Sequence, residues 1–143
     1  MSIYKTVARG SSESIQLEVS SEFKPSLSVT PPPEFKGPKE FWSPEDIFCA
    51  SISSCYLLTF KAMARFKKLE WRDIEVSVDA HLEKSPTGLK FTKVEIRPFL
   101  TICCQSTVDE YLKVLESAKS NCLVTSSMNC DFSVIPKIKV KAK

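Results

Sequence analysis

The sequence has little of several features that mark large classes of protein. Among its 143 residues there is one histidine, His81, and no two cysteines form a C-x-x-C pair, so we expect no zinc site and no other cofactor. Lysine and arginine total 20 against 17 acidic residues and are scattered, which argues against nucleic-acid binding. No apolar run approaches the roughly 20 residues of a membrane span, and the first ten residues lack a signal-peptide core. We therefore expect a soluble, cytoplasmic protein with no membrane partner.

The composition is that of a folded domain. Hydrophobic residues make up 43% of the chain and charged residues 26%, which excludes disorder and low complexity. A chain of this length buries roughly 68–70% of its unfolded surface, so a sizeable core needs no disulfide staples. We expect a single domain over residues 1–143.

The first forty residues predict strands followed by a stiff connector. Short alternating runs lie within residues 3–30, the clearest being Ile15-Gln-Leu17-Glu-Val19, and indicate a meander of strands. The proline-rich stretch over residues 30–38 is expected to be an extended connector without helix or central strand.

The strongest helix signal begins at residue 43. Ser43 suits the N-cap, Pro44 suits the first helical position, and Asp46 follows three residues after Ser43 as in a capping box. We expect this helix to run from about residue 44 to residue 68. Its first four turns, EDIFCASISSCYLLTF, are apolar or small nearly all round, so a sheet or a partner must cover them.

The second half of the chain predicts a hairpin, two helices and a final strand. Alternation over residues 74–82, a turn at Ser85-Pro-Thr-Gly88 and a strand over 89–101 indicate an antiparallel hairpin. Helical spacing predicts a helix at 107–119, broken by Ser120-Asn121, and a third short helix follows. The order of elements defines an α+β fold.

The short helix is expected over residues 122–128 and the final strand over residues 132–140. Lysines alternate with apolar residues at the end of the chain and predict a solvent-facing row that discourages edge pairing. These lysines are Lys137, Lys139, Lys141 and Lys143.

The cysteines carry more information than any other residue type. Without an export signal their thiols are expected to be reduced, so a disulfide framework is not expected. Cys103 and Cys104 would point to opposite faces of a strand and make a poor chelate. We interpret four of the six as structural: Cys49, Cys103, Cys104 and Cys130.

Two cysteines have contexts that leave their role open. Cys55 falls on one stripe of the long helix, as a small core residue would. Cys122 follows Asn121, a good N-cap, so we expect Cys122 in the first turn of a short helix, where free backbone N–H groups would lower the pKa of its thiol. A lowered pKa at Cys55 would need an arginine or another donor nearby. From the residues alone, either cysteine could be structural or reactive.

The order of these segments resembles the OsmC/Ohr family. The stretch SPEDIFCASISSC, in which Glu45 precedes Cys55 by ten residues, resembles the family, and so does Cys122 directly after the helical segment EYLKVLESAKSN. The resemblance covers most of the chain and implies an OsmC-like fold, with antiparallel sheets wrapped around the long central helices of an intertwined homodimer. Leu123 stands where the Ohr-like branch usually has proline, which places the chain nearer the broader OsmC-like group.

The resemblance implies a peroxiredoxin-like organic hydroperoxide reductase, an antioxidant enzyme of the oxidative stress response. On this interpretation the Cys55 thiolate attacks the peroxide and becomes a sulfenic acid, and Cys122 condenses with it to a redox-active disulfide. A dithiol, of the lipoyl type in the Ohr branch, would then reduce the disulfide.

The family also places a glutamate and an arginine at the site, where they keep the thiolate ionised and orient the peroxide. Glu45 matches the glutamate by its spacing to Cys55, and Arg9 in Ala-Arg9-Gly10 is the best match to the arginine. Their ordinary roles would be to complement a helix dipole and to occupy a surface turn. Ten helical residues span roughly 15 Å, so Glu45 can serve Cys55 only from the other subunit of an antiparallel pair.

Two alternatives to a peroxidase remain. One is a non-catalytic protein on the same scaffold that binds a small apolar ligand at the dimer interface, or a thiol redox sensor. The other, an acyl-thioester enzyme, lacks a placed acid or base. Aromatic residues near the proposed site could seat an alkyl chain or fill the core: Phe41, Trp42, Phe48, Tyr56 and Phe60.

Overall fold

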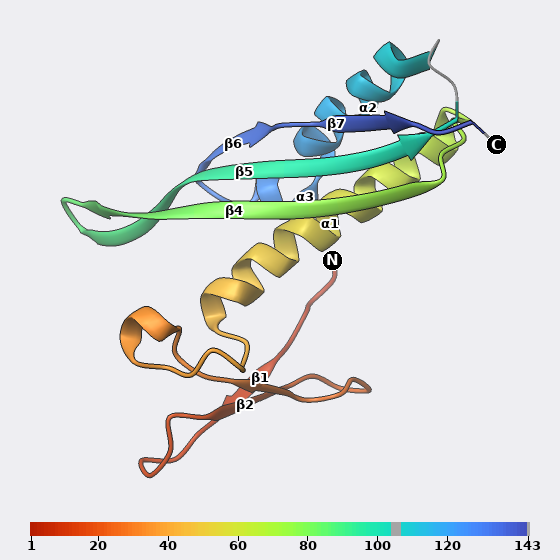
Figure 1. The fold of residues 1–143 in the computed structure, drawn as a ribbon. Coiled ribbons are helices and arrows are strands. Elements are labelled where there is room, and N and C mark those ends of the chain that lie inside the picture. Colours follow the sequence, from red (N-terminus) through yellow and green to blue (C-terminus); the bar gives the residue numbers. More distant parts are fainter. Residues whose placement is uncertain (104–106, 143) are drawn as a thin grey trace. The chain divides into compact units, whose positions relative to one another are not determined.

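The computed structural model describes residues 1–103 and 107–142, and the chain divides into two compact units, Met1–Phe48 and Cys49–Lys143. The long helix α1 (Pro44–Phe66) begins in the first unit and continues in the second. Strands, long helix, hairpin, two helices and strands follow one another in the predicted order (Figure 1). The α+β prediction is confirmed. Cys104 and Lys143 lie outside the described residues.

The first unit contains the predicted meander. Strands β1 (Val7–Arg9), β2 (Leu17–Ser20) and β3 (Leu27–Val29) form an antiparallel sheet in the order β1-β2-β3. A parallel bridge from Val29 to Trp42 ties the sheet to the segment that precedes α1. The short elements agree with the short alternating runs in the sequence.

The proline-rich connector contains one turn of helix, contrary to our expectation. A 3₁₀ turn, η1 (Pro33–Phe35), begins at a proline, where the missing N–H is no loss because the first N–H groups of a helix have no partner within it. The turn closes tightly at Gly37, whose N–H donates to the Pro32 carbonyl at 3.0 Å. A Cβ at Gly37 would lie 1.6 Å from the Pro31 carbonyl oxygen, so only glycine fits there.

Helix α1 begins with the predicted capping box. The Ser43 hydroxyl accepts the N–H of Asp46 at 3.1 Å, and the Asp46 carboxylate accepts the N–H of Ser43 at 3.0 Å. Two backbone donors that a helix start would leave unpaired are thereby satisfied.

The end of α1 comes two residues before the predicted position because Lys68 adopts a left-handed conformation with φ 56°. The N–H of Leu69 donates to the Ala64 carbonyl at 2.8 Å, and that of Lys68 donates to the Arg65 carbonyl at 3.0 Å. This is a Schellman end without its usual glycine, so no glycine marks the end of the helix in the sequence.

The second unit is built on a long hairpin. Strands β4 (Asp73–Ser85) and β5 (Gly88–Ile102) pair antiparallel, as predicted, with a two-residue connection (Figure 1). The register shifts once, between His81 and Leu82 of β4. Gly88 ends the connection with φ 120°, a conformation that residues with a side chain rarely adopt.

The predicted final strand is two short strands, β6 (Asp131–Val134) and β7 (Lys137–Val140), both parallel to β5. The register is the same on either side of the break, since Val134 pairs with Ile96 and Lys137 with Phe99. The break therefore lies opposite Pro98 of β5, and it contains Pro136. Neither proline has an N–H, which accounts for the interruption. Lys137 and Lys139 are exposed, as expected.

The helices after the hairpin differ from the prediction at their junction. Helix α2 (Val108–Asn121) continues through Ser120-Asn121, which we expected to break it. Helix α3 (Leu123–Ser126) is a single turn. Asn121 is not the N-cap of α3, because its side chain donates to the Ser117 carbonyl within α2 at 2.9 Å, and Cys122 is the N-cap instead.

The core of the second unit lies between one face of β5 and the helices. Every fourth residue of this part of α1 is buried, a stripe that meets buried side chains of α2 and β5. The opposite face of α1 stays open, with Leu58 64% exposed. The core residues are Ile52, Tyr56, Phe60 and Ala64 of α1, Tyr111, Val114, Leu115 and Ala118 of α2, and Val94, Ile96, Leu100 and Ile102 of β5.

One sequence expectation about α1 needs correction. By length and composition alone this 23-residue helix could cross a membrane. Its serines and threonine lower the mean hydropathy of the helix only slightly. The core helix of a soluble protein passes the same test.

The capping box gives a prediction about stability. Replacing Ser43, which is 2% exposed, in Ser43→Ala should lower the free energy of unfolding by about 1 kcal/mol, because the Asp46 N–H loses its acceptor. The matched control is Ser120→Ala, at an exposed helical position, which should change the free energy by less than about 0.5 kcal/mol. Urea unfolding followed by circular dichroism measures both, and equal effects would contradict the prediction.

Candidate functional site

The thiols of Cys55 and Cys122 meet in the second unit. Cys55 lies in the middle of α1, and Cys122 lies at the junction of α2 and α3. Their side chains are hydrogen-bonded to each other, and neither is part of a disulfide. Residues 67 positions apart in the sequence are thus brought into contact as two reduced thiols.

The surroundings of Cys55 favour its thiolate. Burial alone would raise the pKa of Cys55, but hydrogen bonds from the Cys122 thiol, the Val124 N–H, the Thr59 hydroxyl and the Leu123 N–H together outweigh it. The pKa of Cys55 therefore lies below its ordinary value. The Thr59 hydroxyl also donates to the Cys55 carbonyl at 2.8 Å, which holds Thr59 on the same face of α1 as Cys55.

Cys122 has the opposite character, contrary to our expectation. Its side chain is fully buried, and this burial, together with its hydrogen bond to Cys55, raises the pKa of Cys122 despite contacts with Thr125 that lower it. We expected a lowered pKa because we placed Cys122 inside the first turn of a helix. As the N-cap it lies ahead of that turn, and the backbone N–H groups of Val124 and Leu123 lower the pKa of Cys55 instead.

A buried tyrosine fixes the distance between the two elements that carry the thiols. Tyr56, next to Cys55 in the sequence, donates its hydroxyl to the Leu115 carbonyl of α2 at 2.5 Å. Burial and then the charge of Glu116 raise the pKa of Tyr56, so it remains a donor throughout the physiological range. Since α2 ends directly before Cys122, this bond holds the two cysteines in register.

An open, mainly apolar groove of about 740 Å³ leads to Cys55. Leu58, Ala62 and Met63 of α1 form one side, and Leu123 and Val124 form part of the other. Among the described residues no charged side chain lines it. A ligand with an apolar body can therefore reach the sulfur from solvent. The remaining lining residues are Ser51, Ser54, Thr59 and Asn121.

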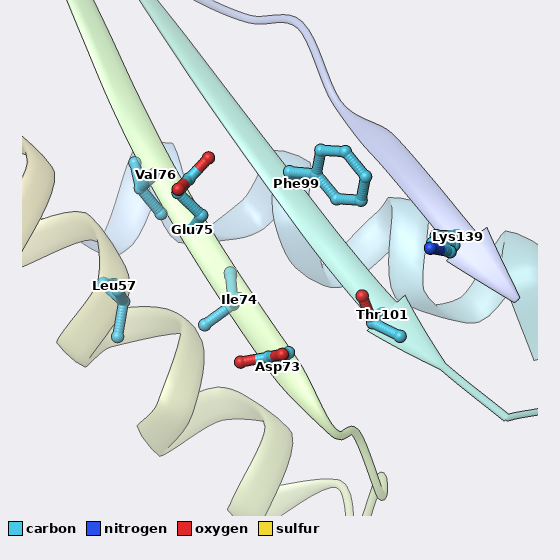
Figure 2. A pocket seen from close by; sticks show the side chains of 8 residues that line it. All are labelled: Leu57, Asp73, Ile74, Glu75, Val76, Phe99, Thr101 and Lys139. Atoms are coloured by element: carbon cyan, nitrogen blue, oxygen red, sulfur yellow. The ribbon is translucent and has the colours of Figure 1, made fainter. Parts of the chain in front are cut away.

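A second hollow of about 610 Å³ lies on the sheet and has a different chemistry (Figure 2). It places Asp73 and Glu75 of β4 and Lys139 of β7 around Phe99 and Thr101 of β5. Its lining contains no cysteine, so we assign the candidate thiol site to the groove at Cys55. Among residues 1–103 and 107–142 no group of three or more His, Cys, Asp or Glu could hold a metal ion.

Glu45 and Arg9, the other two predicted site residues, lie in the first unit. The Arg9 guanidinium is exposed and donates to the Ser20 hydroxyl at 3.4 Å. One carboxylate oxygen of Glu45 is buried and has no hydrogen-bond partner among the described residues. Within the described part of one chain the two side chains form no ion pair.

The remaining described cysteines form no disulfide within the described residues and are not among the residues that line the groove. Cys130 donates to the Phe91 carbonyl at 3.4 Å, and Cys49 and Cys103 are partly buried. Tyr56 and Phe60, offered above as alkyl-chain contacts, are fully buried core residues. Sequence reasoning missed the donors Thr59, Leu123 and Val124. Only Thr59 could have been predicted from the sequence, because it lies one turn after Cys55 on the same face of the helix.

The fold and the paired thiols define a class of small α+β thiol proteins, and comparison with known proteins names the family. A family model described as OsmC-like protein matches residues 37–136, more than half of the chain. The chain belongs to this OsmC-like family. The YmaD protein of Bacillus subtilis, described as uncharacterized, is 21% identical over 117 residues, which cover 80% of this chain and 78% of YmaD.

Solved structures of OsmC and Ohr proteins share the fold over nearly the whole chain. An OsmC-like protein of unknown function from Vibrio cholerae has a TM-score of 0.83 at 20% identity, covering 97% of this chain and all of its own. An organic hydroperoxide resistance protein OsmC from Legionella pneumophila has 0.75 at 20% identity, covering 98% and 100%. The organic hydroperoxide resistance protein OhrB of Bacillus subtilis has 0.70 at 18%, covering 96% and 98%.

These identities show a shared fold. OsmC-like family proteins are soluble, and a core helix of a soluble protein meets the same length and composition test as α1.

The opposed pKa shifts give a prediction about thiol reactivity. Alkylation by iodoacetamide, located by peptide mass spectrometry, should reach half-maximal rate at a lower pH for Cys55 than for Cys122, because only the thiolate reacts. Cys122→Ala removes a donor and should move the Cys55 midpoint to higher pH. Cys122→Ser, which keeps an O–H donor, should move it less. Equal midpoints for the two cysteines of the unmodified protein would contradict the assignment.

Proposed function

We propose that this protein is a two-cysteine thiol peroxidase that reduces organic hydroperoxides in the cytoplasm. The observation that carries the proposal is the contact between Cys55, whose pKa is lowered, and the protonated, buried thiol of Cys122 at the end of an apolar groove. Solved structures from Legionella pneumophila and Bacillus subtilis that share this fold are named organic hydroperoxide resistance proteins, which supports organic hydroperoxides as the substrate class.

The first step consumes the peroxide. The Cys55 thiolate attacks the terminal oxygen of R–O–O–H, the O–O bond breaks, and a new S–O bond makes Cys55 a sulfenic acid. The alkoxide that leaves takes a proton from solvent and departs as the alcohol. Cys55 has then lost two electrons to the peroxide. The apolar groove would seat the R group while the donors around Cys55 hold the sulfur in place.

The second step uses the proton that Cys122 has kept. Its sulfur attacks the sulfur of the sulfenic acid, the S–O bond breaks, and the hydroxide leaves as water with the Cys122 proton. A dithiol of the lipoyl class would then supply two electrons and two protons to restore both thiols. Because the two thiols are already in contact, the disulfide needs only small movements of the chain.

Counting thiols tests this sequence of steps. Treatment of the reduced protein with cumene hydroperoxide should remove two thiols per chain, since Cys55 and Cys122 are both consumed. Cys55→Ser should lose no thiols over the time in which the unmodified protein loses two. Cys122→Ser should lose one thiol, and its Cys55 should then over-oxidise beyond the sulfenic acid. Hydrogen peroxide should react more slowly than cumene hydroperoxide in a stopped-flow comparison.

The opposite result points to a different function. If the unmodified protein and Cys55→Ser consumed peroxide equally slowly, the peroxidase proposal would fail. The groove of about 740 Å³ would then be the place to look for an apolar ligand.

We also propose that the working form is a homodimer. The face of α1 opposite its buried stripe carries exposed apolar residues such as Leu58. Within the described residues β4 pairs with β5 alone, which leaves 13 residues of strand edge open. A long open edge and an apolar helix face both favour association with a second copy.

A second copy would also bring Glu45 and Arg9 to Cys55. Glu45 and Cys55 are ten residues apart on α1, roughly 15 Å along the helix, so one straight helix cannot offer both to one substrate. The buried oxygen of Glu45 lacks a donor among the described residues of one chain. We propose that Glu45 and Arg9 orient the peroxide at the Cys55 of the partner subunit.

Subunit mixing gives a sharp test of this arrangement. Cys55→Ser should be inactive and Glu45→Gln should be slowed, but a mixed dimer joins an intact Cys55 to an intact Glu45 of the other chain. A statistical 1:1 mixture of the two variants, unfolded and refolded together, should therefore recover about a quarter of the wild-type sites. Activity no higher than the average of the two separate variants would contradict a glutamate acting between subunits. A mass in solution of one chain, 16.1 kDa, would contradict the dimer itself.

A further inference from the structure

The groove at Cys55 contains a second sulfur that the proposed reaction does not use. Met63 of α1 lines the groove together with Cys55, and its side chain is partly buried. Eight residues separate the two along the helix, roughly 12 Å at 1.5 Å per residue, so one groove spans both sulfurs. A thioether sulfur is polarizable and is oxidised without first losing a proton, so its reactivity does not depend on a lowered pKa.

An amide donor lies beside this sulfur. The side-chain nitrogen of Asn121 donates to the Ser117 carbonyl at 2.9 Å and lies 4.0 Å from the Met63 sulfur. The nitrogen carries two hydrogens, so one is left for Met63 after Ser117 has taken the other. Because a thioether is a weak acceptor, this donor is poorly used while Met63 is reduced. An oxygen atom added to the sulfur on the side of Asn121 would be a stronger acceptor and would fill the gap.

From this arrangement we infer that Met63 is a modification site: organic hydroperoxides that enter the groove oxidise it to the sulfoxide, and the Asn121 amide binds the new oxygen. The sulfur gives an electron pair to the terminal oxygen of R–O–O–H, an S–O bond forms, and the O–O bond breaks. The hydroperoxide proton passes to the departing alkoxide, which leaves as the alcohol. Methionine loses two electrons, and the peroxide gains them.

The apolar lining of the groove selects which peroxide reaches Met63. Side chains along the groove enrich a hydroperoxide with an apolar body beside the sulfur, and they include Leu58, Ala62 and Leu123. Burial of one or two methylene groups favours such a peroxide about four- to fifteenfold over hydrogen peroxide. Met128 offers a comparison within the chain, because it is also partly buried but is not among the residues that line the groove.

Oxidation of Met63 would change the groove for the reaction at Cys55. A sulfoxide is polar, so the groove would lose affinity for an apolar substrate. Its bond to Asn121 would also tie α1 to the last residue of α2, directly before Cys122. Abundant peroxide would therefore slow the oxidation of Cys55 until a methionine sulfoxide reductase restores Met63. This consequence rests on the function proposed above, whereas the oxidation itself rests on the groove and the thioether.

The test compares the two methionines in Cys55→Ser, which keeps Met63 but lacks the thiol that would consume the peroxide. Circular dichroism establishes that the variant is folded. The full-length protein is treated with cumene hydroperoxide or with hydrogen peroxide, and peptide mass spectrometry follows the sulfoxide at Met63 and Met128. The ratio of the Met63 rate to the Met128 rate should be at least about fourfold higher with cumene hydroperoxide than with hydrogen peroxide.

The stereochemistry of the sulfoxide tests the amide. One of the two epimers at Met63 should form in excess, since only an oxygen that faces Asn121 gains the hydrogen bond. Each epimer is reduced by its own enzyme, MsrA or MsrB, so the fraction that each enzyme reduces measures the ratio of epimers. Asn121→Ala should bring the two epimers close to equal amounts. Ser120→Ala, an exposed neighbour on α2, is the matched control and should leave the excess unchanged.

The effect on Cys55 has a readout of its own. The unmodified protein is treated with excess cumene hydroperoxide, its disulfide is reduced with dithiothreitol, and the oxidation of Cys55 is measured again. The second rate should be about fourfold lower or less, and treatment with MsrA and MsrB should restore it. Met63→Leu, which has no sulfur at this position, should show the same rate in both rounds. An equal fall in both proteins would contradict the effect on Cys55.

Two results would overturn the inference. One is a ratio of Met63 to Met128 oxidation that is the same for both peroxides, since the groove would then have no part in the reaction. The other is an epimer ratio that Asn121→Ala leaves unchanged, since the amide would then not bind the oxygen. Failure of the proposed function is distinguishable, because a Cys55 that ignores cumene hydroperoxide leaves the result at Met63 standing.

Discussion

The hydrogen bond from Tyr56 to the Leu115 carbonyl is the constraint on which the site depends. It joins α1 to α2 inside the core, one residue from Cys55 and seven residues before Cys122. A buried hydroxyl that lost this acceptor would cost about 1–3 kcal/mol, so the helices are held in one register. Because α2 leads directly into Cys122 and the amides after it, fixing α2 against α1 also fixes every donor that Cys55 meets from that side.

The two thiols differ because burial and donors are distributed unequally between them. Both lose hydration, which on its own favours the neutral thiol. Hydrogen bonds from two backbone N–H groups, a hydroxyl and the Cys122 thiol lower the pKa of Cys55. Burial and its hydrogen bond to Cys55 raise the pKa of Cys122, which is fully buried. The pKa values of the two thiols therefore move in opposite directions, and the thiolate is favoured at Cys55 rather than at Cys122. A resolving thiol that keeps its proton is useful, because that proton leaves with the hydroxide of the sulfenic acid.

Features that depend on neighbouring residues could be predicted from the sequence, and those that depend on distant contacts could not. The capping box at Ser43 and the β4–β5 hairpin are local patterns, and both were predicted correctly. The break between β6 and β7 arises because Pro136 lies opposite Pro98 of β5. That pairing is known only from the register of the strands. We predicted a lowered pKa for Cys122, whereas its pKa is raised. The prediction placed Cys122 in the first turn of α3, but the helix begins one residue later and Cys122 is its N-cap.

The apolar face of α1 has to serve two purposes if the proposed function holds. A second copy would cover part of it, and the groove over Cys55 must stay open to a peroxide. The apolar lining then gives a reason for preferring organic peroxides. Burying each methylene group is worth about 0.8 kcal/mol, close to a fourfold gain in occupancy, whereas hydrogen peroxide has no carbon to bury. On the proposed mechanism the hydrogen-bond donors act on the Cys55 sulfur alone, so they would speed reaction with both peroxides and leave selectivity to the groove.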